Sequence, residues 1–451
     1  MPSLSNLIRR GARPVTRSAL RSLGTQRWVV LILGAVTLGA VTLVGLAGVG
    51  LAKNPATDQN PGPPAGLAPD LRAMVKNGGV AVGLDGQTEW SYHDGTYIPA
   101  SILKLATAQT ALTRLGDDFR FSTRFYLDAD RNLYIKGFGD PVLISEEWAL
   151  IAEELKSRGM FDQPLKEVRV DDSAFERDIL VDGASESLNP YDARLGALVS
   201  NFNSIMVELD RKGNVRSLEP QTPLTPTAQR LAHRMKPGRD RISLSAEYND
   251  GLFYSGELAQ AIFARYGAKF TGGVALAKVP PNLKEFLHHR SSHTLADAVR
   301  IMLRYSNNYV ANQIVLVMAL EAKGEPAHLE DGVALIREHL KTRLNLGPDQ
   351  VRLVEGSGLS RKNQVTLGAM LTIADGFYPW EHLMTPRGQG DLMAPAKTGT
   401  LTGVYTLAGF LPAPQGRRRP FVILLNQNQN TRDKLFLKML QYYQQHSQAM
   451  N

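Results

Sequence analysis

Apolar and polar positions form distinct patterns along the chain, and these patterns predict where helices and strands lie. Between residues 78 and 97, short apolar runs are separated by turn residues, which is typical of strands joined by tight turns. Pro99 precedes a helical pattern over residues 101–115, and Gly116 ends it. Residues 295–318 again show helical periodicity with one polar interruption, so we expect two successive helices there.

The end of the chain predicts strands that pair with each other. Residues 396–400, 404–410 and 421–425 have the composition of strands. Thr402-Gly403 supplies a turn, so the first two strands should form an antiparallel hairpin. A last helix is expected from about Asp433.

The middle of the chain predicts a separate lobe, over residues 118–285. Strand-like pieces lie at residues 120–127, 132–135 and 167–170, and a helical segment lies near residues 146–156. Strands and helices therefore mix in this lobe.

The N-terminal region predicts a membrane-targeting segment. Residues 1–53 contain seven Lys or Arg and no Asp or Glu, and residues 28–52 contain no charged residue. A run of about 25 residues at about 1.5 Å per residue can cross a bilayer, and preceding arginines keep the N-terminus in the cytoplasm. A cleaved signal peptide with Gly50-Leu51-Ala52 as its cleavage site is the alternative, although the apolar run is long for one. Either reading places the bulk of the protein outside the cytoplasm.

Charge and composition exclude several classes of function. Removing the seven N-terminal cations from the net charge of +8 leaves about +1 for the rest, so we expect no nucleic-acid partner. The chain has no cysteine, which excludes disulfides, thiol nucleophiles and Cys-based zinc sites. No Gly-x-Ser-x-Gly, His-Glu-x-x-His, phosphate-loop or dinucleotide pattern is present, and the nine histidines show no metal-ligand spacing. We expect no metal and no cofactor.

Ser101 and Lys104 are the first candidate pair for chemistry. Positions i and i+3 of a helix share a face, so the hydroxyl and the amine should point the same way. Burial among apolar neighbours should lower the pKa of Lys104, so that its neutral amine can accept the Ser101 proton. The simpler alternative is an N-cap serine with a solvated lysine, and this motif alone favours that alternative.

Two further short motifs carry suitable side chains. Ser306 and Asn308 stand where the helical pattern is interrupted, and can present a hydroxyl and an amide to a cleft; an ordinary polar turn is the alternative. Ser187-Leu188-Asn189 has the same pattern, but it lies in a Pro-containing loop rather than between two helices, so Ser306 is preferred. The last motif lies on a predicted strand and consists of Lys397, Thr398, Gly399 and Thr400. The edge of this strand can bind a peptide in an extended conformation. An ordinary strand that enters a turn is the alternative.

Together and in this order, the three motifs resemble the signature of penicillin-binding proteins and serine β-lactamases. The separation of about 205 residues between Ser101 and Ser306 indicates an inserted lobe. This resembles the low-molecular-mass D-alanyl-D-alanine carboxypeptidase/endopeptidase group that carries such an insertion. The likeness extends over residues 70–440, with Glu355 standing where that group would be expected to have Asp, and includes further segments: 137–141, 171–175, 189–191, 200–203 and 356–363.

The resemblance implies a role for each matching residue. Ser101 is expected to be acylated, Lys104 to be the base, and Ser306 to pass a proton to the leaving D-alanine. Asn308 is expected to hold the substrate amide, and Lys397 with Thr398 the terminal carboxylate. The backbone N–H groups of Ser101 and Thr400 would form the oxyanion hole. The implied partners are peptidoglycan peptides ending in D-Ala-D-Ala and β-lactam antibiotics.

Asp140 and Arg361 are weaker candidates for substrate binding. An acidic residue from the lobe and an arginine near the cleft can read the amine and carboxylate of a stem peptide. The alternatives are equally good: Asp140 is then an ordinary loop aspartate before a proline, and Arg361 an ordinary surface arginine.

Two other functions stay open. A β-lactamase shares the acylation machinery, but the segment from Glu186 to Asn189 that resembles its deacylating loop precedes the Ser306 motif and is one residue short. A non-catalytic cell-wall binding or scaffold protein would keep the pocket without the activity.

We therefore predict an α/β (α+β) protein with a penicillin-binding protein/serine β-lactamase-like domain, in which an antiparallel sheet is flanked by helices and split by an inserted mixed α/β lobe. It would lie in the inner (cytoplasmic) membrane as a single-pass protein with its catalytic domain in the periplasm. The expected parts are a cytoplasmic basic segment (1–27), a transmembrane signal-anchor (28–52), a Pro-rich linker (53–70), a catalytic domain (71–117 and 286–445) and the inserted domain (118–285).

Overall fold

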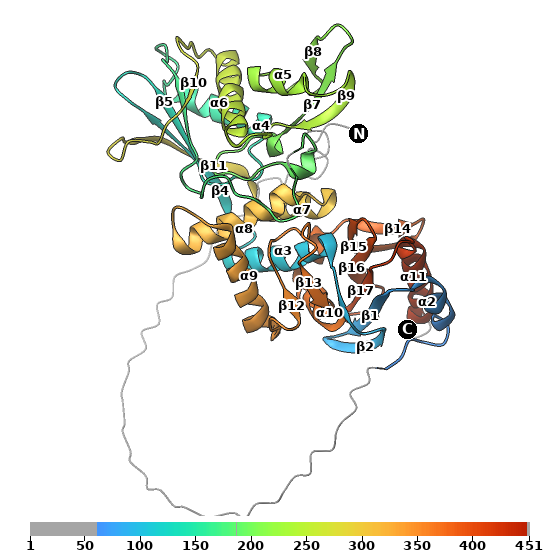
Figure 1. Cartoon of the computed structure of the whole chain (residues 1–451). Coiled ribbons are helices and arrows are strands. Elements are labelled where there is room, and N and C mark those ends of the chain that lie inside the picture. Colours follow the sequence, from blue (N-terminus) through green and yellow to red (C-terminus); the bar gives the residue numbers. More distant parts are fainter. Residues whose placement is uncertain (1–60, 186, 449–451) are drawn as a thin grey trace, which may run out of the picture. The chain divides into compact units, whose positions relative to one another are not determined.

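The computed structural model describes residues 61–185 and 187–448 (Figure 1). The predicted basic segment and the predicted membrane span lie outside these residues, as do residues 53–60 of the predicted linker. Within the described part of the chain, no helix has the length and apolar character needed to span a bilayer.

A six-stranded antiparallel sheet forms the centre of the first domain. Leu401 pairs with Val404 across the Thr402-Gly403 turn, so the predicted hairpin is confirmed. The sheet joins both ends of the described chain, because its N-terminal strand pairs with its C-terminal one. The strands in spatial order are β14 (Pro386–Gln389), β15 (Leu392–Leu401), β16 (Val404–Leu411), β17 (Arg419–Leu425), β1 (Gly78–Leu84) and β2 (Gln87–Tyr92).

Helices cover both faces of this sheet (Figure 1). Successive residues of a strand point to opposite faces, so Val80 and Val82 of β1 join one core and Ala81 joins the other. The Val80 face packs against α2 (Ala68–Met74) and α11 (Arg432–Gln448). The opposite face packs against a larger helical layer: α3 (Lys104–Leu115), α7 (Leu295–Tyr305), α8 (Asn308–Lys323), α9 (Leu329–Leu344) and α10 (Leu367–Gly376).

Small elements complete this domain. The short 3-10 helix η1 (Ala100–Leu103) leads directly into α3, and η4 (Tyr378–Leu383) follows α10. A three-stranded sheet closes the end of the helical layer, in the order β12 (Val351–Arg352), β13 (Gln364–Thr366) and β3 (Thr96–Tyr97).

The inserted lobe has its own sheets and its own core. A five-stranded mixed sheet packs against α4 (Ser145–Ser157) and α6 (Tyr248–Arg265). Its strands in spatial order are β10 (Val274–Leu276), β6 (Val168–Asp171), β5 (Leu133–Gly137), β4 (Arg120–Leu127) and β11 (Glu285–Thr294). A second sheet packs with α5 (Pro226–Ala232) and has the order β8 (Val215–Ser217), β7 (Ser204–Leu209) and β9 (Gly238–Ser243).

The chain enters the lobe through β4 and leaves it through β11, and these two strands pair antiparallel. The predicted lobe boundary at residue 285 falls on the first residue of β11, whose pairing continues to Thr294. Leu295 then begins α7, and its N–H donates to the carbonyl of Phe119, so entry and exit lie side by side.

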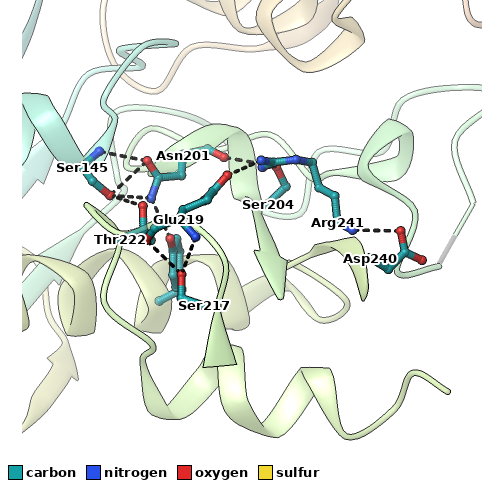
Figure 2. A network of polar contacts seen from close by, with 9 residues as sticks. Ser145, Asn201, Ser204, Ser217, Glu219, Thr222, Asp240 and Arg241 are labelled. Atoms are coloured by element: carbon teal, nitrogen blue, oxygen red, sulfur yellow. Dashed lines mark hydrogen bonds and ion pairs between the residues drawn. The ribbon is translucent and has the colours of Figure 1, made fainter. Parts of the chain in front are cut away.

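A buried polar network joins the two halves of the lobe (Figure 2). The Asn201 side chain accepts a hydrogen bond from the Ser145 N–H at 2.9 Å and donates to the Tyr254 hydroxyl at 2.8 Å. The hydroxyls of Ser145 and Thr222 lie 2.8 Å apart. These contacts fix the 3-10 turn η3 (Asn201–Asn203) between α4 and α6.

Candidate active site

Ser101 and Lys104 meet at the junction of η1 and α3. The Nζ atom of Lys104 lies 3.0 Å from the Oγ atom of Ser101. Lys104 has no exposed surface, whereas Ser101 is partly exposed. The serine is therefore accessible to a substrate, and the amine that faces it is shielded from water.

The backbone before Ser101 has an unusual conformation and is held by two neighbouring segments. Ala100 has a φ of +49°, in the left-handed region that non-glycine residues seldom occupy. The Thr406 hydroxyl donates to the Pro99 carbonyl at 2.7 Å. A Cβ added to Gly358 would lie 1.9 Å from the carbonyl oxygen of Ala100, so that loop packs directly on this backbone. Ser101 is thus presented by a tight turn, with the regular α-helix beginning only at Lys104.

Lys104 donates to three oxygen atoms. Besides Ser101 Oγ, these are Asn308 Oδ1 and the Ser357 carbonyl, each at 2.7 Å. Burial lowers the pKa of Lys104 from 10.5 to about 7, and the carboxylate of Glu355 acts in the opposite direction. An amine with this pKa is partly neutral near pH 7 and can accept a proton from the serine.

Ser306 and Asn308 lie where α7 passes into α8. Ser306 ends α7 with φ +54° and ψ +35°, and this left-handed residue turns the chain. Asn307 caps α8, because its side chain accepts from the Val310 N–H at 3.0 Å. The break in helical periodicity therefore places Ser306 and Asn308 beside Lys104 and Lys397.

The third motif lies on β15. Lys397 is 1% exposed and its Nζ atom lies 2.8 Å from Ser306 Oγ. Burial holds the pKa of Lys397 well below its usual value, and the positive charge of Lys104 lowers it further. Strand β14 pairs with β15 only at residues 392–395, so among described residues no strand pairs with the motif on that side.

Gly399 brings β15 against the turn that contains Ser101. A Cβ at this position would lie 2.2 Å from Thr406 Oγ1 and 2.8 Å from the Ser101 backbone nitrogen. The absence of a Cβ therefore lets the strand and the turn come into contact. A glycine in a strand can also allow a ligand to approach the backbone, but here the neighbour is another part of the protein. Arg432, 8% exposed, donates to the Gly399 carbonyl and to Thr400 Oγ1, both at 3.1 Å.

The two weaker candidates occupy different environments. Asp140 is 3% exposed, and its Oδ1 atom accepts from the Val142 N–H at 2.8 Å. Burial raises the pKa of Asp140 to about 7. Arg361 is exposed and donates to the Thr402 carbonyl, in the turn that follows the Lys397 strand. Arg361 is thus open to solvent near the motif, and Asp140 is enclosed.

A cavity of about 270 Å³ adjoins the motif residues and was not predicted. Asn308 and Tyr309 line it from α8, and Asp192 lines it from the lobe. The Asp192 carboxylate accepts from the hydroxyls of Ser185 and Ser187. The geometry therefore favours Asp192 over Asp140 as the lobe carboxylate beside the site, and Ser187, set aside in favour of Ser306, contributes to the same loop.

Glu355 and Arg432 were also missed as parts of the site. Glu355 stands next to the Gly-Ser-Gly segment, and that neighbourhood was a usable signal for it. Arg432 follows a polar loop near the C-terminus, and nothing in its sequence context distinguishes it from a surface arginine.

A serine beside a buried lysine, a second serine beside a second buried lysine, and an edge strand define the class of penicillin-recognising serine hydrolases. Comparison with known proteins narrows this class. The sequence profile of the D-Ala-D-Ala carboxypeptidase 3 (S13) family matches residues 69–236, 231–378 and 382–441, and the chain belongs to that family. It is a hydrolase, a serine-type D-Ala-D-Ala carboxypeptidase of the penicillin-binding kind.

Individual relatives are distant in sequence. The D-alanyl-D-alanine carboxypeptidase DacB of Haemophilus influenzae is 25% identical over 74% of this chain and 82% of its own length. The D-alanyl-D-alanine carboxypeptidase of Actinomadura sp. strain R39 is 25% identical over 71% of each chain. The crystal structure of penicillin-binding protein 4 from Haemophilus influenzae has a TM-score of 0.67 at 22% identity, covering 84% of this chain and 99% of that one. The predicted fold class is confirmed.

Proposed function

We propose that the enzyme cleaves the terminal D-Ala-D-Ala bond of peptidoglycan stem peptides through an acyl-enzyme on Ser101. The observation that carries this proposal is the 3.0 Å contact between Ser101 Oγ and the fully buried amine of Lys104. The neutral amine takes the hydroxyl proton, and Oγ attacks the carbonyl carbon of the scissile amide. The backbone N–H groups of Ser101 and Thr400 stabilise the oxyanion that forms.

The second serine completes the acylation. Ser306 gives its proton to the nitrogen of the leaving D-alanine, and Lys397 at 2.8 Å replaces that proton when it is charged. The C–N bond breaks, D-alanine departs, and the acyl group remains on Ser101 as an ester. Lys104 then gives the proton it took from Ser101 to solvent, and Lys397 regains its proton from solvent. Water attacks the ester, Lys104 accepts the water's proton and passes it to Ser101 Oγ as the ester bond breaks, and the free serine is restored.

The remaining motif residues hold the substrate. The peptide lies as an extended strand along the edge of β15, where residues beyond 395 have no partner from β14. Thr398 and Lys397 receive the terminal carboxylate, and Arg361 stands near the same strand end. Asn308 Oδ1 is occupied by Lys104, so its NH₂ group faces the substrate amide.

A fluorescent penicillin tests the nucleophile in the full-length protein. One label per chain should form, it should map to the peptide containing Ser101, and Ser101→Ala should take none. A folded Ser101→Ala variant that is labelled as fast as the parent overturns the assignment. A β-lactam resembles the peptide substrate, so we expect it to acylate the serine and then to be hydrolysed slowly. Penicillin-binding protein 4 of Haemophilus influenzae has been crystallised with a β-lactam.

The same protein separates the remaining alternatives. Rapid and repeated hydrolysis of penicillin would indicate a β-lactamase, and no labelling at all would indicate a binding or scaffold protein. Mass spectrometry of muropeptides divides carboxypeptidase from endopeptidase activity. Loss of one alanine reports the former, and opened crosslinks report the latter.

We also propose that residues 28–52 tether the enzyme to the inner membrane, with the catalytic domain in the periplasm. The support is the uncharged run itself and the arginines that precede it. Fractionation of cells that express the full chain tests this. Sedimentation with membranes and release by detergent support the tether, and a soluble exported product that begins after residue 52 contradicts it.

A further inference from the structure

Glu355 is a buried carboxylate behind the nucleophile. It follows β12 and has no exposed surface. Five donors converge on its two oxygen atoms: Asn312 Nδ2 (3.0 Å), Ser357 N (2.7 Å), Ser357 Oγ (2.6 Å), Ser360 N (3.2 Å) and Asn363 Nδ2 (2.7 Å). In all five hydrogen bonds the partner donates and Glu355 accepts. An ionised carboxylate can only accept, so it fits this pattern.

The loop that Glu355 organises forms one wall around Lys104. The Ser357 carbonyl accepts from Lys104 Nζ at 2.7 Å. The two preceding peptide groups are fixed to the flanking helices, because the Gly356 N–H donates to Asn312 Oδ1 at 2.7 Å and the Gly356 carbonyl accepts from Thr107 Oγ1 at 2.7 Å. The shape of this loop therefore sets where the Lys104 amine can lie.

We infer that Glu355 is a positioning residue for the acylation step. Its carboxylate holds the loop so that the Ser357 carbonyl meets Lys104, and it is an anionic group close enough to act on this amine. This inference rests on the proposed function of Ser101 and Lys104. Glu355 contacts Ser357, whose carbonyl contacts Lys104, and among the described residues no hydrogen bond joins Glu355 directly to Lys104 or to Ser101.

Burial and the neighbouring negative charge have opposite effects on the pKa of Lys104. Burial lowers the pKa of Lys104 and Glu355 raises it. Lys397 lies on the substrate side, where the two lysines disfavour each other's charge, and Arg387 and Arg432 act on Lys397 in the same sense. Glu355 is thus the anionic group that keeps the base from becoming too weak to accept the serine proton.

The test is the pH profile of acylation by a fluorescent penicillin in the full-length protein. In Glu355→Gln the midpoint of the acid limb should move down by about 1 pH unit, because the facing negative charge is gone. The maximal rate should also fall, because one oxygen acceptor becomes an NH₂ donor. Glu355→Asp keeps the charge, so its midpoint should stay with the parent even where its maximal rate falls.

A second variant guards against a folding failure of Glu355→Gln. The double substitution Glu355→Gln with Asn363→Asp exchanges amide and carboxylate along one hydrogen bond, so the pairing is kept and the charge moves away from Lys104. Its acid limb should again lie below that of the parent. Thermal unfolding confirms that each variant is folded.

The outcomes distinguish a failure of the role of Glu355 from a failure of the proposed function. The role of Glu355 is overturned if the acid-limb midpoint stays unchanged both in Glu355→Gln and in the double variant. It is also overturned if the midpoint of Glu355→Asp moves down as far as that of Glu355→Gln. Failure of the parent to be acylated at all overturns the proposed function itself. A purely structural role would reduce the maximal rate in every variant and leave every midpoint where it was.

Discussion

Lys397 Nζ lies 2.8 Å from Ser306 Oγ, although 91 residues separate them in the chain. The contact joins strand β15 to the break between α7 and α8. Lys397 is 1% exposed, and Lys104 is held on the Asn308 side of the same break. The two serines of the site are therefore each paired with a buried lysine.

This pairing predicts coupled losses of activity. Ser306→Ala and Lys397→Met should each lower kcat/KM for a peptide ending in D-Ala-D-Ala by about 10²–10⁴-fold, the range typical of a lost proton-transfer group. The double variant should be little worse than either single one, because the two residues act as a unit. Losses that multiply in the double variant would show that the residues act independently.

Gly399→Ala should reduce acylation by about 100-fold. The new Cβ would lie 2.2 Å from Thr406 Oγ1 and 2.8 Å from the Ser101 nitrogen, so strand and nucleophile must move apart. Gly368→Ala is the matched control, because its Cβ meets no atom within 4 Å and its site is helical. The control should keep full acylation and gain about 0.5–1 kcal/mol in the free energy of unfolding. Equal acylation by both variants contradicts the close contact.

The buried amine should cost stability in a defined pH window. The pKa of Lys104 is about 7 in the folded protein and 10.5 ordinarily, so between these values the unfolded chain binds the extra proton and stability falls as pH falls. Relative to Lys104→Met, the parent should lose about 1.4 kcal/mol per pH unit from about pH 10 down to about pH 7. Denaturant unfolding of both proteins at several pH values measures this. A pH-independent difference contradicts it.

Asp140 should behave in the opposite way. Its folded pKa is raised to about 7 by burial, so the folded protein binds the extra proton above the ordinary pKa of 3.8, and stability falls as pH rises through this window. Asp140→Asn should therefore gain stability relative to the parent between pH 4 and pH 7, and the gain should level off above. Unfolding midpoints at pH 4, 6 and 8 give the trend. Acylation should be unchanged, and a large rise in KM for the peptide would instead support the substrate contact.

Local features of the fold were predictable because neighbouring residues determine them. Gly116 ends α3 as expected, and the helical break at Ser306 is present in the structure. The strand predicted at residues 120–127 is β4, and the hairpin turn at Thr402-Gly403 is confirmed. Each of these depends on a pattern within a few residues.

The other features depend on distant parts of the chain. Ser101 was predicted to open an α-helix, yet it lies in the 3-10 turn η1, because Gly358 and Thr406 hold the preceding backbone in place. Asp192 lies beside Asn308 only once the lobe has folded onto α8. No pattern around Asp192 or Ser101 contains that information.

The central claim is that burial keeps the Lys104 amine neutral beside Ser101, and the pH dependence of acylation measures it most directly. The rate constant for labelling of the full-length protein by penicillin should rise about tenfold per pH unit up to about pH 7 and then stop rising. A rate that keeps rising toward pH 10.5, as for an ordinary lysine, or one that does not change between pH 5 and pH 9, would contradict the account.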